Sequence, residues 1–449
     1  MTSSPEPLEP KPTAASDHPA DALAGLYLHV PFCSAICPYC DFAVRKDSAD
    51  QHGAFVTALE LEIRRAAEEW RSLGQGLPAA ERFDTVYWGG GTPSLLSAVE
   101  LETLFETLRL ALPIVPTPRI YFEANPEDVD PPRLALWRRL GVTSLSLGVQ
   151  AFDAEDLSFL GRRHTAEQAE SAIRSALDAG FETVSVDLIY GLPHHRADPW
   201  RRTLDRVVAL EPHHLSCYEL EIHPRTVFGR RRQRGELVPM DEPRQARLFE
   251  LTHRHLGASG YAGYEVSNFA REPRFHSQHN RKYWHHVPYL GLGPSAHSYA
   301  GDRRWWNERS LPRWRRKLEA GDSPVAEAER LRPDELALEA LMLGLRTAVG
   351  PDLEQIERRF GVELRAPNAP LLDDLARRGL ARLEGSRVVP TVAGLAVADG
   401  LAARFEIVPT SPDPIAPKRG SKENLVDRRS VVETGASGSS SEGKARNQP

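Results

Sequence analysis

Short apolar runs alternate with longer amphipathic stretches over the first half of the chain. The apolar runs are rich in β-branched and aromatic residues, whereas residues 54–70 and 166–180 repeat apolar side chains every three or four positions. The first pattern predicts strands, and the second predicts helices. We expect six strands, and these cover Leu26–Val30, Phe83–Trp88, Arg119–Ala124, Ser144–Val149, Thr183–Tyr190 and His214–Leu220.

Polar and turn-forming residues recur at the carboxyl ends of the predicted strands. The sequences VPFC, GGGTP, EANP, GVQ and DLIYGLP mark the ends of five of them. Strands that alternate with helices favour a parallel sheet, and in a βα barrel the loops at the carboxyl ends of the strands hold ligands. The pattern therefore predicts the α/β class, with a partial (β/α)6 barrel like an incomplete TIM barrel.

The alternation stops after about Pro224. A helical stretch at Glu242–Ser259 precedes an aromatic and histidine-rich region, and a helical module at 333–405 ends in strand-like runs such as SRVVPT. The module predicts an α-rich C-terminal domain with a winged-helix-like end. The expected divisions are a disordered tail at 1–22, a core barrel at 23–240, a second region at 241–330, the C-terminal domain at 331–405 and a disordered tail at 406–449.

The charge balance is that of an ordinary soluble protein. The 449 residues include 56 Lys and Arg against 62 Asp and Glu, which gives a net charge of -6. We expect no nucleic-acid partner, because this balance outweighs the suggestion of a wing. The N-terminus lacks the basic start and apolar run of a secretory signal, and the uncharged stretches 22–40 and 283–301 hold prolines and histidines. We therefore expect no transmembrane segment and a cytoplasmic location.

Three of the four cysteines stand together directly after the first predicted strand. Cys33, Cys37 and Cys40 form a CxxxCxxC loop, and thiolates that converge in this way suit an iron-sulfur cluster or zinc. Three thiols leave one iron of a four-iron cluster open. The alternative is a closed zinc site with His29 as fourth ligand, which would not explain the polar ends of the other strands. Cys217, on the sixth strand, is expected to pack as a small apolar residue.

The cysteine loop and the following GGGTPS sequence at 89–94 resemble the radical S-adenosylmethionine superfamily. In that superfamily the methionine end of the cofactor chelates the open iron, and an electron from the cluster cleaves it to a 5'-deoxyadenosyl radical. The resemblance implies a [4Fe-4S] cluster on Cys33, Cys37 and Cys40. It also implies S-adenosylmethionine bound by Tyr27, Tyr39, Gly90, Gly91, Thr92, Glu123, Gln150, Arg162 and Asp187. Simpler interpretations remain: a structural acid for Asp187, a surface charge for Arg162 and a plain turn for the glycines.

Residues 26–405 are similar to the oxygen-independent coproporphyrinogen III oxidase-like family, and two motifs favour its heme-chaperone branch. Phe42 stands where the oxidase has a further cysteine, and HNRKYW occupies 279–284. This branch implies heme as a ligand, a heme side at 241–330 and His279 as the iron ligand. Nearby alternatives are His276, His285, His286 and His297.

The resemblance also sets the expected partners. Heme would pass to an acceptor hemoprotein, and a membrane-bound protein is a candidate for this acceptor. The resemblance does not identify the electron donor. The alternative function is that of a coproporphyrinogen III dehydrogenase or another radical oxidoreductase acting on a tetrapyrrole. Whether the chain is an enzyme is therefore left open, and no catalytic residue is assigned.

Overall fold

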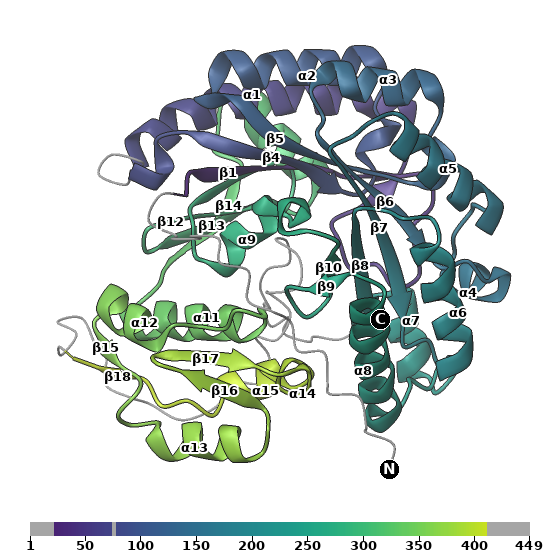
Figure 1. Cartoon of the computed structure of the whole chain (residues 1–449). Coiled ribbons are helices and arrows are strands. Elements are labelled where there is room, and N and C mark those ends of the chain that lie inside the picture. The colour runs from purple at the N-terminus through teal and green to yellow at the C-terminus, as the bar shows by residue number, and fades with distance from the viewer. Residues whose placement is uncertain (1–21, 74–77, 411–449) are drawn as a thin grey trace, which may run out of the picture.

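The computed structural model describes residues 22–73 and 78–410, and one large sheet organises the part of the chain up to residue 330 (Figure 1). Its centre consists of parallel strands joined by helices, as the alternation predicts. These strands are β1 Ala24–Val30, β4 Phe83–Gly90, β5 Ile114–Ala124, β6 Ser144–Gln150, β7 Thr183–Tyr190 and β8 His214–Glu219. All six predicted strands are confirmed.

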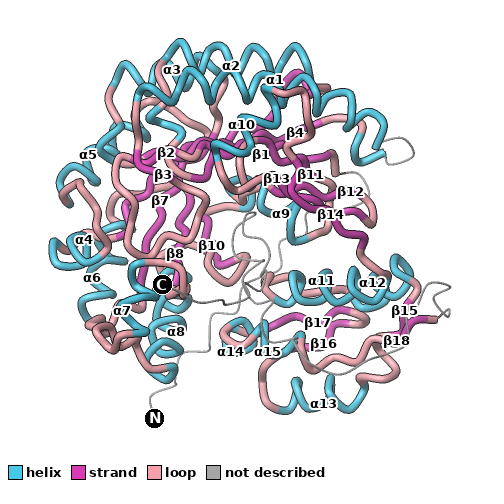
Figure 2. The backbone as a smooth tube through the Cα atoms, turned by 180° about the vertical axis from the view of Figure 1, so that it is seen from behind, coloured by secondary structure: helices cyan, strands magenta, loops and turns pink. Residues whose placement is uncertain are grey.

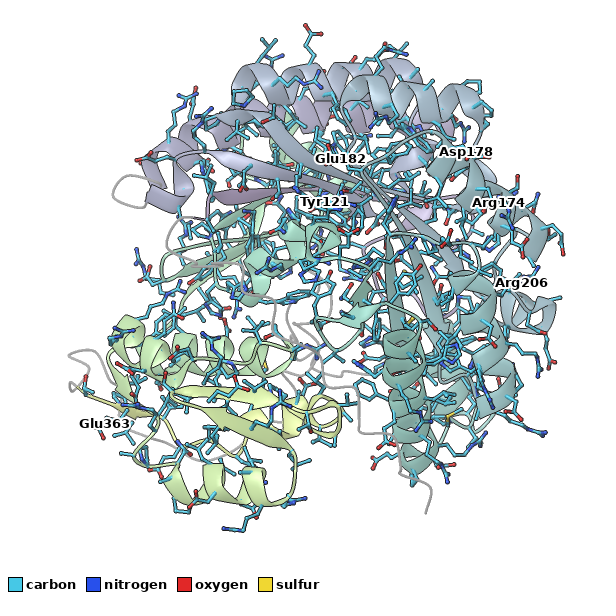
Figure 3. All side chains as sticks on the ribbon, in the orientation of Figure 1. Tyr121, Arg174, Asp178, Glu182, Arg206 and Glu363 are labelled. Atoms are coloured by element: carbon cyan, nitrogen blue, oxygen red, sulfur yellow. The ribbon has the colours of Figure 1, made fainter. Side chains whose placement is uncertain are left out.

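Helices cover the outer face of the curved sheet (Figure 1). Two of them begin with capping boxes, Ser97 with Glu100 and Thr165 with Gln168, which satisfy backbone donors at the first turn. Figure 3 shows Tyr121 within the sheet and Arg174 on one of the outer helices, residues 166–178. The helices are α1 Ala49–Leu73, α2 Ala98–Ala111, α3 Pro131–Leu140, α4 Ala154–Phe159, α5 Ala166–Asp178, α6 Ala197–Val208, α7 Val227–Gln233 and α8 Glu242–Ala258.

The same sheet continues beyond the six predicted strands at both edges. On one side β11 Tyr289–Leu292 pairs in parallel with β1, and on the other β10 Asn268–Ala270 pairs with β8. The remaining strands of this sheet are β12 His297–Ala300, β13 Arg303–Asn307, β14 Val325–Arg330 and β9 Ala262–Gly263. Among the described residues the sheet has 12 strands, with β14 and β9 at its ends, so it is an open barrel. Much of region 241–330 is thus built into the barrel's own sheet.

Smaller elements close the two ends of this barrel. At the carboxyl ends of the strands, β2 Phe32–Cys33 pairs with β3 Arg45–Lys46 and holds the cysteine loop. At the opposite ends, α9 Gln278–Trp284 contacts β4 and β1. Further short elements are α10 Leu311–Glu319 and 3-10 turns at Pro78–Ala80, Pro93–Leu95, Pro126–Asp128 and Pro273–Phe275.

The C-terminal unit has its own apolar core, on the side of the molecule away from α1, α2 and α3 (Figure 2). Arg346 pairs with Glu265 at 3.4 Å and so ties this unit to the barrel. The unit consists of α11 Pro333–Leu345, α12 Leu353–Phe360, β15 Val362–Glu363, α13 Ala369–Arg377, β16 Ala381–Glu384, β17 Arg387–Pro390, α14 Val392–Leu395, α15 Ala398–Ala402 and β18 Val408–Pro409. The β16–β17 hairpin follows α13, but the likeness to a winged helix stays a prediction.

The start of the predicted C-terminal tail, at residue 406, is wrong. Glu406 exchanges two hydrogen bonds with the buried Asn368, and β18 pairs with β15. These backbone bonds hold the segment although it has few large apolar side chains. The predicted disorder at 1–21 and 411–449 lies outside the described residues. Within the described ranges, no helix combines the length and the apolar character that crossing a membrane requires.

Candidate functional site

A cavity of about 360 Å³ occupies the interior of the barrel, within the usual range of ~300–1,000 Å³ for small-molecule sites. Every second residue of β6, β7 and β8 faces it, which places a series of hydroxyl groups inside. Eleven of the predicted site residues line it: Cys33, Cys37, Tyr39, Cys40, Gly90, Gly91, Thr92, Glu123, Gln150, Arg162 and Asp187. This polar interior was not predicted from the sequence, although the alternation in SLSLGVQ indicates it.

The three cysteines of the loop converge at the cavity. All three are free thiols, and burial, followed by the neighbouring thiols, raises the pKa of Cys33 to about 12 and that of Cys40 to about 11. Cys217 is buried in the barrel core, as predicted, and does not line the cavity. Three converging thiols without a fourth in the described cavity fit a four-iron cluster with one open iron.

His29 cannot complete a zinc site in this arrangement. The imidazole is fully buried, its Nδ1 lies 3.1 Å from the Tyr27 hydroxyl, and its Nε2 lies 3.1 Å from the Ala43 carbonyl oxygen. Both nitrogens are therefore occupied, and the zinc alternative loses its fourth ligand. Tyr27, predicted to touch the cofactor, does not line the cavity and instead supports His29.

Two of the three glycines in the GGGTP sequence, Gly90 and Gly91, are required by the protein's own packing. Gly90 has a φ of 105°, and a Cβ added there would lie 2.5 Å from the His29 Nδ1. A Cβ on Gly91 would lie 2.5 Å from the Phe32 carbonyl oxygen and 2.8 Å from that of Val30. The loop after β4 thus packs directly against the cysteine loop. Gly90 and Gly91 permit this close approach, so their role is more than the formation of a turn.

Two half-buried carboxyl groups face the cavity from β5 and β7, the strands on either side of β6. Glu123 accepts hydrogen bonds from the Tyr87 hydroxyl at 2.8 Å and from the Gly90 N–H at 3.2 Å. Asp187 accepts one from the Ser146 hydroxyl at 3.1 Å. Burial raises the pKa of Glu123 to about 7 and that of Asp187 to about 6. Both groups are therefore able to change charge near neutral pH.

Arg162 is a half-buried cation that lines the cavity, so the interpretation as a surface charge is wrong. Its Nη2 donates to Asn125 Oδ1 and to the Gly148 carbonyl oxygen, both at 2.6 Å, and its Nη1 lies 3.6 Å from the Cys37 sulfur. Asn125 in turn donates to the Thr92 hydroxyl at 3.2 Å. Arg162 thereby connects the cysteine loop to the loops after β4 and β5.

Gln150 carries an unused acceptor into the cavity. It lies at the end of β6 with a φ of 67°, and its buried Oε1 has no hydrogen-bond partner among the described residues. A strained residue with an unsatisfied polar atom in a cavity is a feature typical of a ligand site. The structure therefore agrees with a bound polar ligand at this position.

His279, predicted to ligate heme, lies behind the cavity wall. Its side chain is 1% exposed, its Nδ1 is 2.9 Å from the Thr85 hydroxyl, and its Nε2 is 2.8 Å from the Tyr283 hydroxyl. Neither nitrogen is free for iron in this conformation. The HNRKYW helix, α9, instead closes the barrel at the amino ends of the strands. There the Gln278 N–H donates to the Tyr121 hydroxyl at 2.9 Å.

The other histidines of the motif region also lie outside the cavity. His286 and His297 are buried, and His276 stacks on Tyr264. His214 and His223 do line the cavity, and neither was predicted from the sequence. His214 is occupied by Ser185 and Tyr264, each at 2.8 Å, whereas His223 lies half-buried at the cavity mouth.

The fold and the cysteine site define the radical S-adenosylmethionine class. Residues 27–207 match the family model of the Radical SAM superfamily, and residues 331–397 match that of the HemN C-terminal domain. The structure of coproporphyrinogen III oxidase HemN from Escherichia coli is similar, with a TM-score of 0.72 and 24% identity, over 86% of this chain and 91% of that one. This likeness confirms the fold and, with the family models, the expected class.

Within that class, the chain belongs to the heme chaperone HemW family. It is 37% identical over 377 residues to heme chaperone HemW of Mycobacterium tuberculosis, over 84% of this chain and 93% of that protein. It is 31% identical over 369 residues to heme chaperone HemW of Bacillus subtilis, over 82% of this chain and 95% of that protein. Membership of the superfamily implies an iron-sulfur cluster and S-adenosylmethionine.

Proposed function

We propose that this protein is a heme chaperone, which binds heme and passes it to an acceptor hemoprotein. The observation that carries the proposal is the similarity to proteins named heme chaperone HemW over 93% of the length of one of them. The presence of Phe42 at the cavity, where the oxidase has a further cysteine, supports the same function. A membrane-bound hemoprotein is the candidate acceptor.

The cofactors occupy the cavity at the carboxyl ends of the strands. Cys33, Cys37 and Cys40 hold a [4Fe-4S] cluster, which with S-adenosylmethionine supplies one-electron chemistry when bound. The predicted residues Tyr39, Gly90, Gly91, Thr92, Gln150, Arg162 and Asp187 line this cavity and would surround the cofactor. Glu123 would accept from the ribose hydroxyls, since a carboxylate has acceptor positions for both.

Heme binds at the mouth of this cavity, and His223 is its iron ligand in place of His279. The His223 side chain is 31% exposed, and its Nε2 lies 3.2 Å from Glu221 Oε2. A carboxylate that holds one imidazole nitrogen leaves the other directed at a metal, as is common for metal-bound histidines. The hydrogen bond to Glu221 raises the pKa of His223 above its ordinary value.

The surroundings of the mouth suit a porphyrin. Phe42, Val44 and Leu220 provide apolar surface there. Arg225 Nη2 lies 2.8 Å from Asp41 Oδ2, and Arg309 Nη2 donates to the Asp41 carbonyl oxygen at 2.6 Å. Two guanidinium groups at one rim are suitable partners for the two propionates of heme.

The test uses anaerobically reconstituted protein that is titrated with heme. The wild type is expected to bind one heme, His223→Ala is expected to lose the histidine-ligated spectrum, and the control His255→Ala, which removes a half-buried histidine paired with Asp205, keeps it. Loss in His279→Ala with an intact cluster, and retention in His223→Ala, would return the ligand to the HNRKYW helix and refute the mouth site.

The same protein separates the chaperone from the oxidoreductase. Incubation with coproporphyrinogen III and a reductant is expected to release no carbon dioxide, and heme-loaded protein is expected to transfer heme to membranes that contain an apo-hemoprotein. Carbon dioxide release coupled to 5'-deoxyadenosine would instead establish the tetrapyrrole oxidoreductase and overturn the proposed function.

A further inference from the structure

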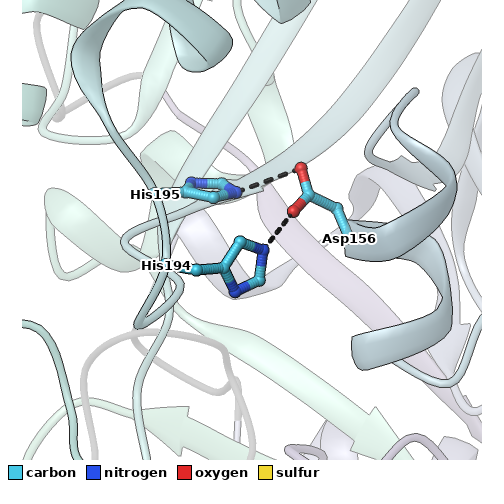
Figure 4. A group of neighbouring side chains, drawn as sticks. All are labelled: Asp156, His194 and His195. Carbon is cyan, nitrogen blue, oxygen red and sulfur yellow. Dashed lines mark hydrogen bonds and ion pairs between the residues drawn. The ribbon is translucent and has the colours of Figure 1, made fainter.

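Asp156, His194 and His195 form a compact group outside the cavity just described (Figure 4). Asp156 lies in the first turn of α4, after β6, and the two histidines lie in the loop after β7. The Nε2 of His194 is 2.7 Å from Asp156 Oδ1, and the Nε2 of His195 is 3.1 Å from Asp156 Oδ2. Two imidazoles from one loop therefore converge on one carboxylate from another.

Hydrogen bonding alone does not satisfy this group. The His195 side chain is 4% exposed, and neither of its ring nitrogens has a hydrogen-bond partner of acceptable geometry among the described residues. A buried polar atom without such a partner is rare in folded proteins and requires an explanation. The histidine is oriented toward the carboxylate but does not form a proper hydrogen bond with it.

The spacing of the three residues suits a metal ion. One ligand atom from each lies within 4.8 Å of the others. Ligands at ~2.0–2.1 Å from a tetrahedral zinc ion lie roughly 3.3 Å apart, so atoms that lie within 4.8 Å of one another need to close by at most about 1.5 Å to hold the ion. Two histidines and one carboxylate are a set that binds zinc with one position left open.

Aromatic side chains hold the two imidazoles in place. His195 stacks on Trp200 at 6.1 Å, and His194 meets the edge of Phe159 at 5.6 Å. Phe159 contacts Phe228 at 4.7 Å, and Phe228 contacts Tyr39 of the cysteine loop at 6.4 Å. The group is thus connected to the support of the cysteine loop through a series of packed rings.

We propose that Asp156, His194 and His195 bind one Zn²⁺ ion, which fastens α4 to the loop after β7. The fourth position is exposed through His194 and holds water. The ion stabilises the pair of loops that carry Arg162 and the end of β7, and the site is separate from the cysteines. This inference does not depend on the proposed heme function.

The test is a titration of cluster-reconstituted protein with Zn²⁺ under anaerobic conditions, because the cluster occupies the three thiols. The wild type is expected to bind one ion, and His194→Ala and Asp156→Asn are each expected to weaken binding by more than about 100-fold. His255→Ala is the matched control, since His255 pairs with the single carboxylate of Asp205 at 2.9 Å. It is expected to bind zinc as the wild type does.

Two further measurements keep the result interpretable. Circular dichroism and cluster absorbance report whether each variant is folded, and His194 is exposed enough to be replaced without loss of packing. A variant with Cys33, Cys37 and Cys40 changed to serine is expected to bind one Co²⁺ without thiolate charge-transfer bands. Equal zinc affinity in the wild type, His194→Ala and Asp156→Asn, or metal binding that disappears with the cysteines, would overturn the proposal.

Discussion

Replacing Glu123 by glutamine is expected to remove a pH dependence from the binding of S-adenosylmethionine. The carboxyl group faces the cavity and already accepts from the Tyr87 hydroxyl and the Gly90 N–H. If it also accepts from the ribose, as proposed, the cofactor binds more tightly to the ionised form. Burial has raised the pKa of Glu123 from 4.5 to about 7, so this ionisation falls in an accessible pH range.

The magnitude follows from that pKa. The ionised fraction of a group with a pKa near 7 is ~0.9 at pH 8 and ~0.09 at pH 6, so the affinity is expected to fall about tenfold between these values. The sign is fixed, because the cofactor favours the form that dominates above the pKa. Glutamine does not titrate, and its amide NH₂ would face either the Tyr87 hydroxyl or the Gly90 N–H, which are both donors. This mismatch is expected to weaken cofactor binding by about 1–3 kcal/mol at pH 8.

The assay is calorimetric titration of cluster-reconstituted protein with S-adenosylmethionine at pH 6, 7 and 8. The ratio of the wild-type and Glu123→Gln affinities removes the cofactor's own titration, which both proteins share. Asp187→Asn serves as the control. Asp187 has a pKa of about 6, so its ionisation contributes to the pH dependence of cofactor binding at the acidic end of the pH range. An affinity ratio that is the same at pH 6 and pH 8 would refute the role of an ionised Glu123.

Three other substitutions test the packing around the site and the C-terminal unit. Gly91→Ala is expected to prevent reconstitution of a full cluster, because its Cβ meets two backbone carbonyl oxygens; full iron content and normal absorbance would contradict this. Arg162→Lys is expected to keep the cluster but lose about tenfold in cofactor affinity, measured by the same calorimetry, because lysine lacks the paired Nη donors; unchanged affinity would argue against it. Asn368→Ala is expected to lower the free energy of unfolding of the C-terminal unit by about 2–3 kcal/mol, since one buried and two partly buried hydrogen bonds are lost. An unchanged thermal transition would exclude this last effect.

The central strands and the cysteine loop were predictable because their signals are local. Runs such as TVSVDLIY are apolar and β-branched over their whole length, and β7 has the predicted bounds Thr183–Tyr190. The strands β9 to β14 were missed because they have two to six residues and include polar side chains that pair only with distant partners. Local patterns contain no information on such pairing.

The environment of individual histidines was not predictable from the sequence. HNRKYW indicates a ligand by its composition, but the burial of His279 depends on Thr85, which is 194 positions away. The group of Asp156, His194 and His195 likewise exists because β6 and β7 are neighbours in the sheet, which brings the loops after them together. In both cases the topology, rather than the spacing along the chain, determines what each side chain contacts.

The position of β1 within the sheet has a consequence for the order of assembly. This strand leads into the cysteine loop, and it pairs on one side with β4 and on the other with β11, as in Gly25 with Tyr289. During synthesis, one edge of β1 therefore stays unpaired until more than half of the chain has been made. Contacts between such distant segments form late in folding, so the base of the cysteine loop becomes fully enclosed only after β11 has joined the sheet.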